Sequence, residues 1–149
     1  MSVTGVALIL FLTFHMSMNI AALFSGEAYN MICEFLGANW YALVATLGLA
    51  ALAVIHIIYA FWLTMQNRKA RGNERYAVTT RPAGVEWSSQ NMLVLGIIII
   101  LGLLLHLFNF WYNMMFAELT GITVAHDPAD GYAYIVDTFA CPVYVVLYI

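Results

Sequence analysis

The sequence is poor in charged residues, and its few basic residues fall in one short stretch. Asp, Glu, Lys and Arg make up 9% of the 149 residues, whereas a soluble domain contains about 25%. There are 5 Lys and Arg residues against 8 Asp and Glu residues, which gives a net charge of -3. This low charge excludes an ordinary soluble domain, and the lack of a broad basic surface argues against a nucleic-acid partner.

Long apolar runs take the place of charge. Hydrophobic residues make up 64% of the chain, and the mean hydropathy is +0.86. Three runs reach the roughly 20 residues needed to cross the hydrocarbon core of a bilayer, and a fourth is still apolar where the sequence stops. We therefore predict an all-α, polytopic transmembrane helix bundle that forms one domain over residues 1–149. Three complete spans and part of a fourth are predicted, at about 4–24, 39–65, 91–116 and 132–149.

Positive charge indicates the orientation of these spans. Every Lys and Arg lies between positions 68 and 81, and these residues are Arg68, Lys69, Arg71, Arg75 and Arg81. By the positive-inside rule, the basic loop 66–90 faces the cytoplasm. No small-residue cleavage site follows the first run, so we interpret it as a retained span and not as a signal peptide.

Each complete predicted span contains one histidine at membrane depth. His15 lies about 16 Å from the cytoplasmic end of the first span, and His106 about 22 Å from that of the third, so both occupy the middle to outer half. His56 lies about 13 Å from the cytoplasmic end of the second span, in the inner half. Gly5 and Gly96 precede His15 and His106 by the same ten residues, which favours one shared level for these two histidines.

Two imidazoles at one depth on different helices are the ligand pattern of a haem bound from both faces. No C-x-x-C-H motif is present, so such a haem would be of the non-covalent b type. Gly102, one turn before His106, would leave room beside a macrocycle, although small residues also serve plain helix packing. The histidines could instead be proton relays, or polar groups bonded to a neighbouring carbonyl. His126 is predicted to be a surface residue, and Cys33 and Cys141 match no metal-binding spacing.

Three stretches of the sequence carry a resemblance to a known family. The first, TGVALILFLTFHMSMNIAALFSGEAYN, contains His15 and Asn19; the second, LAVIHIIYAFWLTMQNRKARGNERY, contains an N-R-x-A-R pattern; the third, SSQNMLVLGIIIILGLLLHLFNF, contains M-x-x-x-G. Together with the span layout over all 149 residues, they resemble the membrane cytochrome b subunit of succinate dehydrogenase/fumarate reductase (complex II). The similarity is to the single-polypeptide, two-haem class of Gram-positive bacteria, epsilonproteobacteria and the Bacteroides group.

The resemblance implies five spans and two haems b held by four histidines. His15 and His106 would ligate the outer (distal) haem. His56 would ligate the inner (proximal) haem together with a histidine of the fourth span, and this sequence does not contain that partner. We therefore expect the natural subunit to continue past Ile149 and to carry the missing histidine within roughly one to three helical turns.

The implied function is to anchor a respiratory complex in the bacterial inner membrane and to pass electrons between menaquinone or menaquinol and a cytoplasmic iron–sulfur subunit. A flavoprotein subunit beyond it would interconvert succinate and fumarate, so the dicarboxylate site would lie on another subunit. Membrane lipid and quinone would be the other partners.

Two kinds of side chain are expected to assist this function. Quinol oxidation releases protons, so a carboxylate acceptor is expected at the outer side. The candidates are Glu34, which we prefer, Glu27 and Asp137, although Asp137 could instead cap the fourth span. On the inner side, Trp87, Ser88, Ser89 and the basic loop are candidates to hydrogen-bond haem propionates.

Two other functions fit the same residues. Cytochrome b subunits of hydrogenases and formate dehydrogenases also carry intramembrane histidines, and they would keep the haem while changing the partner. A non-haem, proton-coupled membrane carrier would use the histidines as relays and would show no haem spectrum.

Overall fold

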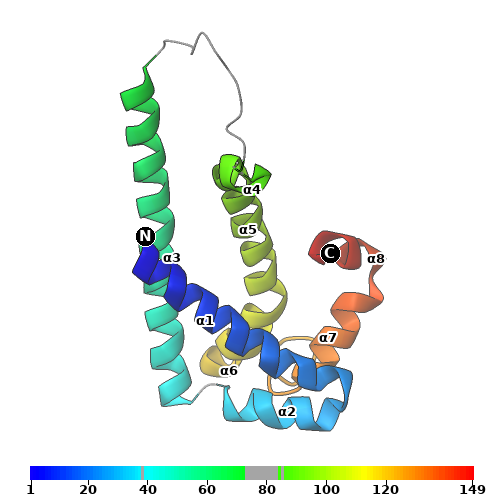
Figure 1. Ribbon diagram of the computed structural model, residues 1–149. Coiled ribbons are helices and arrows are strands. Elements are labelled where there is room, and N and C mark those ends of the chain that lie inside the picture. Colours follow the sequence, from blue (N-terminus) through cyan, green and yellow to red (C-terminus); the bar gives the residue numbers. More distant parts are fainter. Residues whose placement is uncertain (38, 73–83, 85) are drawn as a thin grey trace.

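The computed structural model describes residues 1–37, 39–72, 84 and 86–149, and every regular element in these ranges is a helix (Figure 1). This confirms the predicted all-α fold. Three continuous helical segments are long and apolar enough to cross a membrane: Ser2–Leu23, Trp40–Ala70 and Met92–Thr120. The chain is therefore a membrane protein, and its three complete spans fall where the hydropathy placed them.

The spans are built from the following elements. The first comprises α1 (Ser2–Asn19) and the 3₁₀ helix η1 (Ile20–Leu23). The second is α3 (Trp40–Arg71). The third comprises α5 (Met92–His106), the π-helix η2 (Leu107–Phe116) and α6 (Ala117–Thr120), and it follows the short α4 (Trp87–Gln90).

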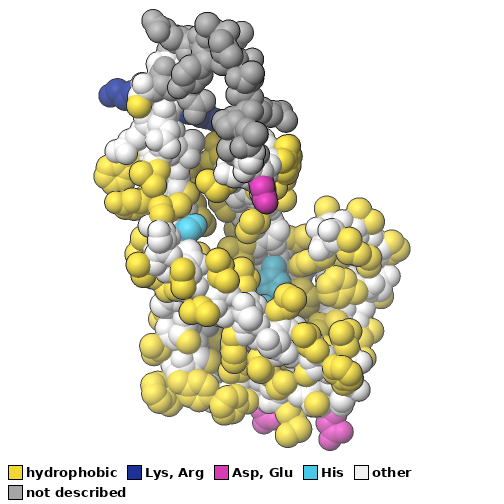
Figure 2. All heavy atoms as spheres, viewed as in Figure 1, with side chains coloured by type: hydrophobic (Ala, Val, Ile, Leu, Met, Phe, Trp, Pro, Cys, Tyr) yellow, Lys and Arg dark blue, Asp and Glu magenta, His cyan; other side chains and the backbone are white. Residues whose placement is uncertain are grey.

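The first span crosses the other two diagonally. α3 and α5 lie roughly alongside each other with opposite chain directions, and α1 starts beside the middle of α3 and ends near α2 (Gly26–Phe35) and α7 (Gly131–Ala140) (Figure 1). We call the end of the bundle formed by α2, α6 and α7 the capped end, and the end where α3 stops and α4 begins the basic end. Figure 2 shows Lys and Arg side chains at the basic end and most acidic side chains at the capped end.

α3 is longer than the predicted second span. It continues past Met65 to Arg71, so Arg68 and Lys69 lie on its last turns and not in an irregular loop. Lys and Arg are good helix formers, and no proline interrupts the run before Gly72, whose φ of 64° ends the helix. The rest of the predicted basic loop at 73–83 and 85 lies outside the described residues.

The connection between the first two spans contains a helix that the sequence analysis did not predict. In α2, Ser25 is the N-cap, and its side chain accepts a hydrogen bond from Ala28 N–H at 3.2 Å. Tyr29 is buried on the side of α2 that faces the bundle, whereas Glu27 and Glu34 are exposed. α2 therefore lies across the capped end as an amphipathic helix.

The predicted fourth span is not one straight helix. α7 and α8 (Pro142–Tyr148) meet at an angle of 100°. Pro142 has no N–H to continue the helix and forces the preceding residue into an extended conformation, and Cys141 has φ -88° and ψ 116°. The expected position of a partner histidine, one to three helical turns after Ile149, assumed a straight fourth span, and this bend removes the basis for that spacing.

Packing is tightest where α2 meets α7 at the capped end. The buried residues there are Tyr29, Ala117, Gly131 and Tyr134. A Cβ atom at Gly131 would stand 2.5 Å from Cys33 Sγ, 2.9 Å from Met114 Cε and 3.1 Å from Tyr29 Cε1. Only glycine fits at this position without a shift of its neighbours, so Gly131 allows α2, η2 and the start of α7 to pack together.

We expect Gly131→Ala to lower the free energy of unfolding by about 1–3 kcal/mol, because overpacking displaces well-packed neighbours. Thermal or denaturant unfolding in detergent micelles measures the change. Gly96→Ala is the matched control, since nothing lies within 4 Å of its would-be Cβ. That variant should keep the stability or raise it by up to about 1 kcal/mol, as alanine is the better helix former. Equal losses in the two variants would contradict the packing argument.

Candidate functional site

The structure brings His15 and His106 into direct contact. His15 lies on α1 and His106 is the last residue of α5, and their ring centroids are 5.6 Å apart with the ring planes at 90°. Both side chains are half-buried in the middle of the bundle. Two residues that are 91 positions apart in the sequence thus form one pair of facing imidazoles.

The surroundings of this pair are aromatic and apolar. Phe11 stacks on His15 with the ring centroids 5.5 Å apart, and the ring centroids of Phe110 and His106 are 5.2 Å apart. Within the described residues, neither imidazole has a hydrogen bond to another side chain or to the backbone. Nothing lies within 4 Å of the would-be Cβ of Gly102, one turn before His106. The two rings are therefore in contact with each other, and no hydrogen bond from the described residues occupies their nitrogens.

A chain of hydrogen bonds ties His15 to the capped end. Asn19 Nδ2 donates to the backbone oxygen of His15 at 2.8 Å, and Tyr29 OH donates to Asn19 Oδ1 at 3.0 Å. Burial raises the pKa of Tyr29, and neighbouring Cys33 adds to the effect. The phenol therefore stays protonated and remains a donor at physiological pH. Asn19 was noted in the sequence together with His15. Its bond to Tyr29 was not predicted, because it depends on the helix α2.

The helix widens immediately after His106. The ten residues of η2 form a π-helix, a rare conformation that is found mostly as single turns near functional sites. Asn113 Nδ2 donates to the backbone oxygens of Phe108 at 3.0 Å and Asn109 at 3.1 Å, and so satisfies carbonyls of the wide turn. Buried Asn109 donates to Tyr148 OH at 3.3 Å, which fixes α8 against η2.

His56 lies apart from this pair, against the start of α1. Its Nδ1 is 2.9 Å from Thr4 Oγ1, and a Cβ at Gly5 would stand 3.6 Å from its Cε1. Thr4 precedes His15 by eleven residues, which is about 16 Å along α1. His56 therefore lies beside the first turn of α1, whereas His15 lies about 16 Å further along that helix. No second histidine contacts His56 within the part of the chain that the structure describes.

His15 and His106 could together hold one metal ion. Two imidazoles on one metal ion, each bonded at about 2 Å, have ring centres roughly 6 Å apart, and the observed separation is 5.6 Å. Neutral imidazole is a good haem ligand. The rings are not held by competing hydrogen bonds in the described part, and their neighbours are apolar, as a macrocycle requires. His56 can supply one ligand at a second site.

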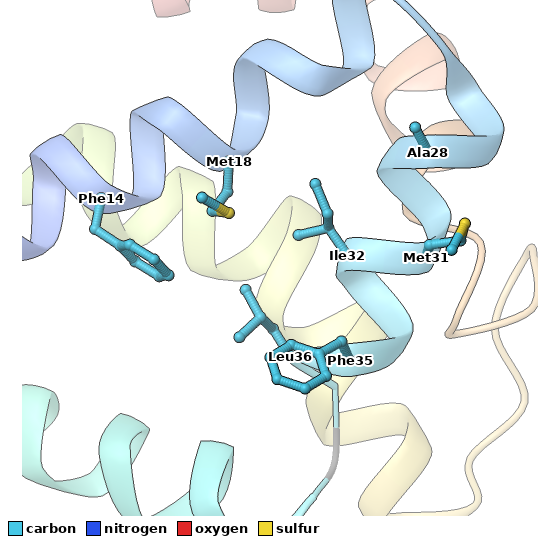
Figure 3. Close-up of a pocket in the computed structure, with 7 residues that line it drawn as sticks. All are labelled: Phe14, Met18, Ala28, Met31, Ile32, Phe35 and Leu36. Carbon is cyan, nitrogen blue, oxygen red and sulfur yellow. The ribbon is translucent and has the colours of Figure 1, made fainter.

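An open apolar pocket of about 470 Å³ lies between α1 and α2 (Figure 3). Phe14 and Met18 of α1 face side chains of α2 across it. Its lining consists of Phe14, Met18, Ala28, Met31, Ile32, Phe35 and Leu36. None of these side chains carries a strong hydrogen-bond donor or acceptor, so the pocket suits a hydrocarbon group and not a polar one.

The candidate proton acceptors lie at the capped end in two separate groups. Glu27 and Glu34 of α2 line one shallow hollow together with Asn30, Asp127 and Asp130. Asp130 accepts from Asn30 Nδ2 at 2.7 Å and from Ala133 N–H at 3.1 Å. The Ala133 and Asn30 bonds hold the pKa of Asp130 below its usual range.

Asp137 belongs to a different group. The alternative interpretation of Asp137 as the cap of the fourth span is wrong, because the N-cap of α7 is Asp130 and Asp137 lies within the helix. Its carboxylate pairs with His126 Nε2. The His126 backbone also bonds Tyr134, whose OH donates to His126 O at 2.8 Å. His126 was predicted to be a plain surface residue; it is partly exposed but fixes the connection to α7.

Trp87, Ser88 and Ser89 lie on the exposed α4 at the basic end. Trp87 is 63% exposed. α4 lies at the basic end of the bundle, far from the contact of α2 with α7 (Figure 1).

No family model, curated protein or solved structure matches this chain.

Proposed function

We propose that the chain is the haem b-carrying membrane subunit of a succinate:quinone oxidoreductase (succinate dehydrogenase/fumarate reductase), which passes electrons between menaquinone or menaquinol and an iron–sulfur subunit. A flavoprotein on that subunit would carry the succinate and fumarate chemistry. The basic end would face the cytoplasm of a bacterial cell, and the capped end the opposite side of its inner membrane.

One observation carries the proposal: His15 and His106, from two different spans, face each other at 5.6 Å in apolar surroundings. A proton relay needs its histidines linked to water, carboxylates or further donors. The aromatic rings in contact with this pair are Phe11 and Phe110, and no carboxylate or donor among the described residues is hydrogen-bonded to it. Aromatic and aliphatic neighbours suit a flat, apolar macrocycle, and the imidazoles suit its iron.

The residues of the chain have distinct parts in the proposed function. His15 and His106 would hold one haem b, and His56 would supply one ligand of a second. A bound haem supplies one-electron redox chemistry, which the amino-acid side chains cannot. Asn19 and Tyr29 fix the backbone at His15, so that the ligand keeps its place on α1. Trp87 and Ser89, at the basic end, are the proposed partners of haem propionates.

The apolar pocket supports a quinone at the capped end. Phe14 and Met18 flank His15 on α1, so a hydrocarbon group in the pocket would lie beside the proposed distal haem. The volume of about 470 Å³ falls within the usual range for small-molecule pockets, about 300–1,000 Å³. Because its lining has no strong polar group, the pocket suits the isoprenoid part of menaquinone. Glu34, on the same helix, is the proposed proton acceptor for its head group.

The test is a reduced-minus-oxidised spectrum of the detergent-purified complex. We expect the sharp α-band of low-spin, bis-histidine haem b. Fumarate should reoxidise the quinol-reduced haem in membranes, and succinate should reduce it. The absence of any haem would overturn the proposal in favour of a proton-coupled carrier. Haem that responds to hydrogen or formate, and not to succinate or fumarate, would assign the chain to a hydrogenase or formate dehydrogenase.

A further inference from the structure

Thr4 is the residue that touches a ring nitrogen of His56. Its Oγ1 lies 2.9 Å from His56 Nδ1, across the crossing point of α1 and α3. The same Oγ1 lies 3.0 Å from the backbone oxygen of Met1, three residues earlier on α1. Both Thr4 and His56 are half-buried, so water competes only partly for these bonds.

The two contacts of Thr4 indicate which nitrogen of His56 carries the proton. A hydroxyl has one hydrogen and two lone pairs, and a carbonyl oxygen can only accept. Threonine in a helix uses its hydrogen in this way, to bond a carbonyl one turn back. When the Thr4 hydrogen is donated to Met1 O, Thr4 Oγ1 accepts from His56 Nδ1–H. In that arrangement His56 Nδ1 carries the proton and Nε2 has the free lone pair.

We propose that Thr4 is a positioning residue for His56, which holds the ring in the tautomer whose Nε2 can bind haem iron. The inference rests on the proposed function. Metal-bound histidines commonly donate their other ring N–H to a protein acceptor, which fixes ring orientation and raises the basicity of the ligand. Gly5 lies beside the same ring, where a Cβ would stand 3.6 Å from His56 Cε1, an ordinary van der Waals contact.

The sign of the effect follows from the bond. An acceptor on Nδ1–H makes the imidazole a stronger electron donor, and a stronger donor favours the oxidised, ferric iron. Loss of the acceptor should therefore raise the midpoint potential of the haem that His56 ligates. The haem of His15 and His106 should not change, because Thr4 lies about 16 Å along α1 from His15.

The experiment compares Thr4→Val and Thr4→Ser in the purified complex. Valine keeps the shape of the side chain and removes the acceptor, whereas serine keeps the hydroxyl. Optical redox titration gives the potential of each haem, and low-temperature electron paramagnetic resonance gives the g-values of each ferric haem. Thr13→Val is the matched control, because Thr13 is also on α1 and donates to Ile9 O at 2.9 Å, and no histidine contact of its hydroxyl is found in the described part.

We expect Thr4→Val to raise the potential and shift the g-values of the His56 haem only, or to lose that haem alone. Thr4→Ser and Thr13→Val should match the wild type. Unchanged potentials in Thr4→Val, the same change in Thr4→Ser or Thr13→Val, or the loss of both haems would overturn the role of Thr4. If His56→Ala, as the single change in the complex, removed no haem, the proposed ligation by His56 would itself be wrong. That result differs from one that excludes only the role of Thr4.

Discussion

Either His15→Ala or His106→Ala should abolish the same haem b signal in the complex, and about half of the total haem should be lost if the subunit carries two. The two imidazoles face each other at 5.6 Å and would share one iron, so removal of either one breaks the same site. The double variant should lose no more haem than either single variant. Haem per complex, and the spectrum of the remaining haem, measure these outcomes.

His126→Ala is the control for a general effect of histidine loss. His126 pairs with Asp137 at the capped end and lies outside the facing pair. This variant should retain the full haem content. If His15→Ala and His106→Ala removed two different haem signals, or if the double variant lost twice as much haem as either single one, the pairing would be wrong.

A reporter fused after Gly72 should report the cytoplasm, and one fused at Ala129 should report the opposite side of the membrane. Arg68 and Lys69 lie at the basic end, whereas Asp127 and Asp130 lie at the capped end. Positive charges near the ends of spans remain on the cytoplasmic side during insertion. A fluorescent protein that folds only in the cytoplasm, paired with a phosphatase that is active only outside it, gives opposite readings at the two positions.

A variant with two fewer positive charges provides the control for this prediction. Changing Arg68 and Lys69 to Gln within the otherwise unchanged basic stretch should weaken the difference between the two fusions, since fewer charges then bias insertion. An external reading after Gly72 in the unmodified chain would contradict the proposed orientation, and with it the assignment of His56 to the inner side.

The long spans could be predicted from the sequence because their signal is local. Some twenty consecutive apolar residues form a helix in lipid whatever surrounds them, since every backbone polar group must be satisfied within the segment. The three spans were placed correctly for this reason. The extension of α3 to Arg71 was missed because charge was taken as the end of the helix, although charge ends the membrane segment and not the helix itself.

Elements that depend on tertiary contacts were harder to predict. α2 is short, and its polar composition resembles a loop; Ser25 as N-cap and the apolar spacing of Tyr29 and Ile32 were the available signals. The bend before α8 had a clear signal in Pro142, but its 100° angle also depends on Tyr148, which packs on Phe139 at 5.4 Å.

The candidate site divides in the same way. Helix rise and direction predicted only a similar depth for His15 and His106, and the family resemblance supplied their pairing; the structure places the two rings together. The contact of Thr4 with His56 could not be read from the sequence, because it depends on the crossing angle of α1 and α3. The apolar pocket could not be predicted either, since one of its two walls is α2.

The π-helix after His106 sets the rotational phase of everything beyond it. Each residue of an α-helix rotates the chain about the helix axis by about 100°. In a π-helix each turn contains more residues, so the rotation per residue is smaller. If one residue were deleted within Leu107–Phe116 and the segment tightened to an α-helix, the elements that follow would turn by about that angle, while His106 kept its orientation. Asn109, now directed at Tyr148, would then point elsewhere. The π-helix thus lets the two halves of the third span present their side chains in independent directions. The half that ends at His106 faces α1, and the half that follows faces α7 and α8.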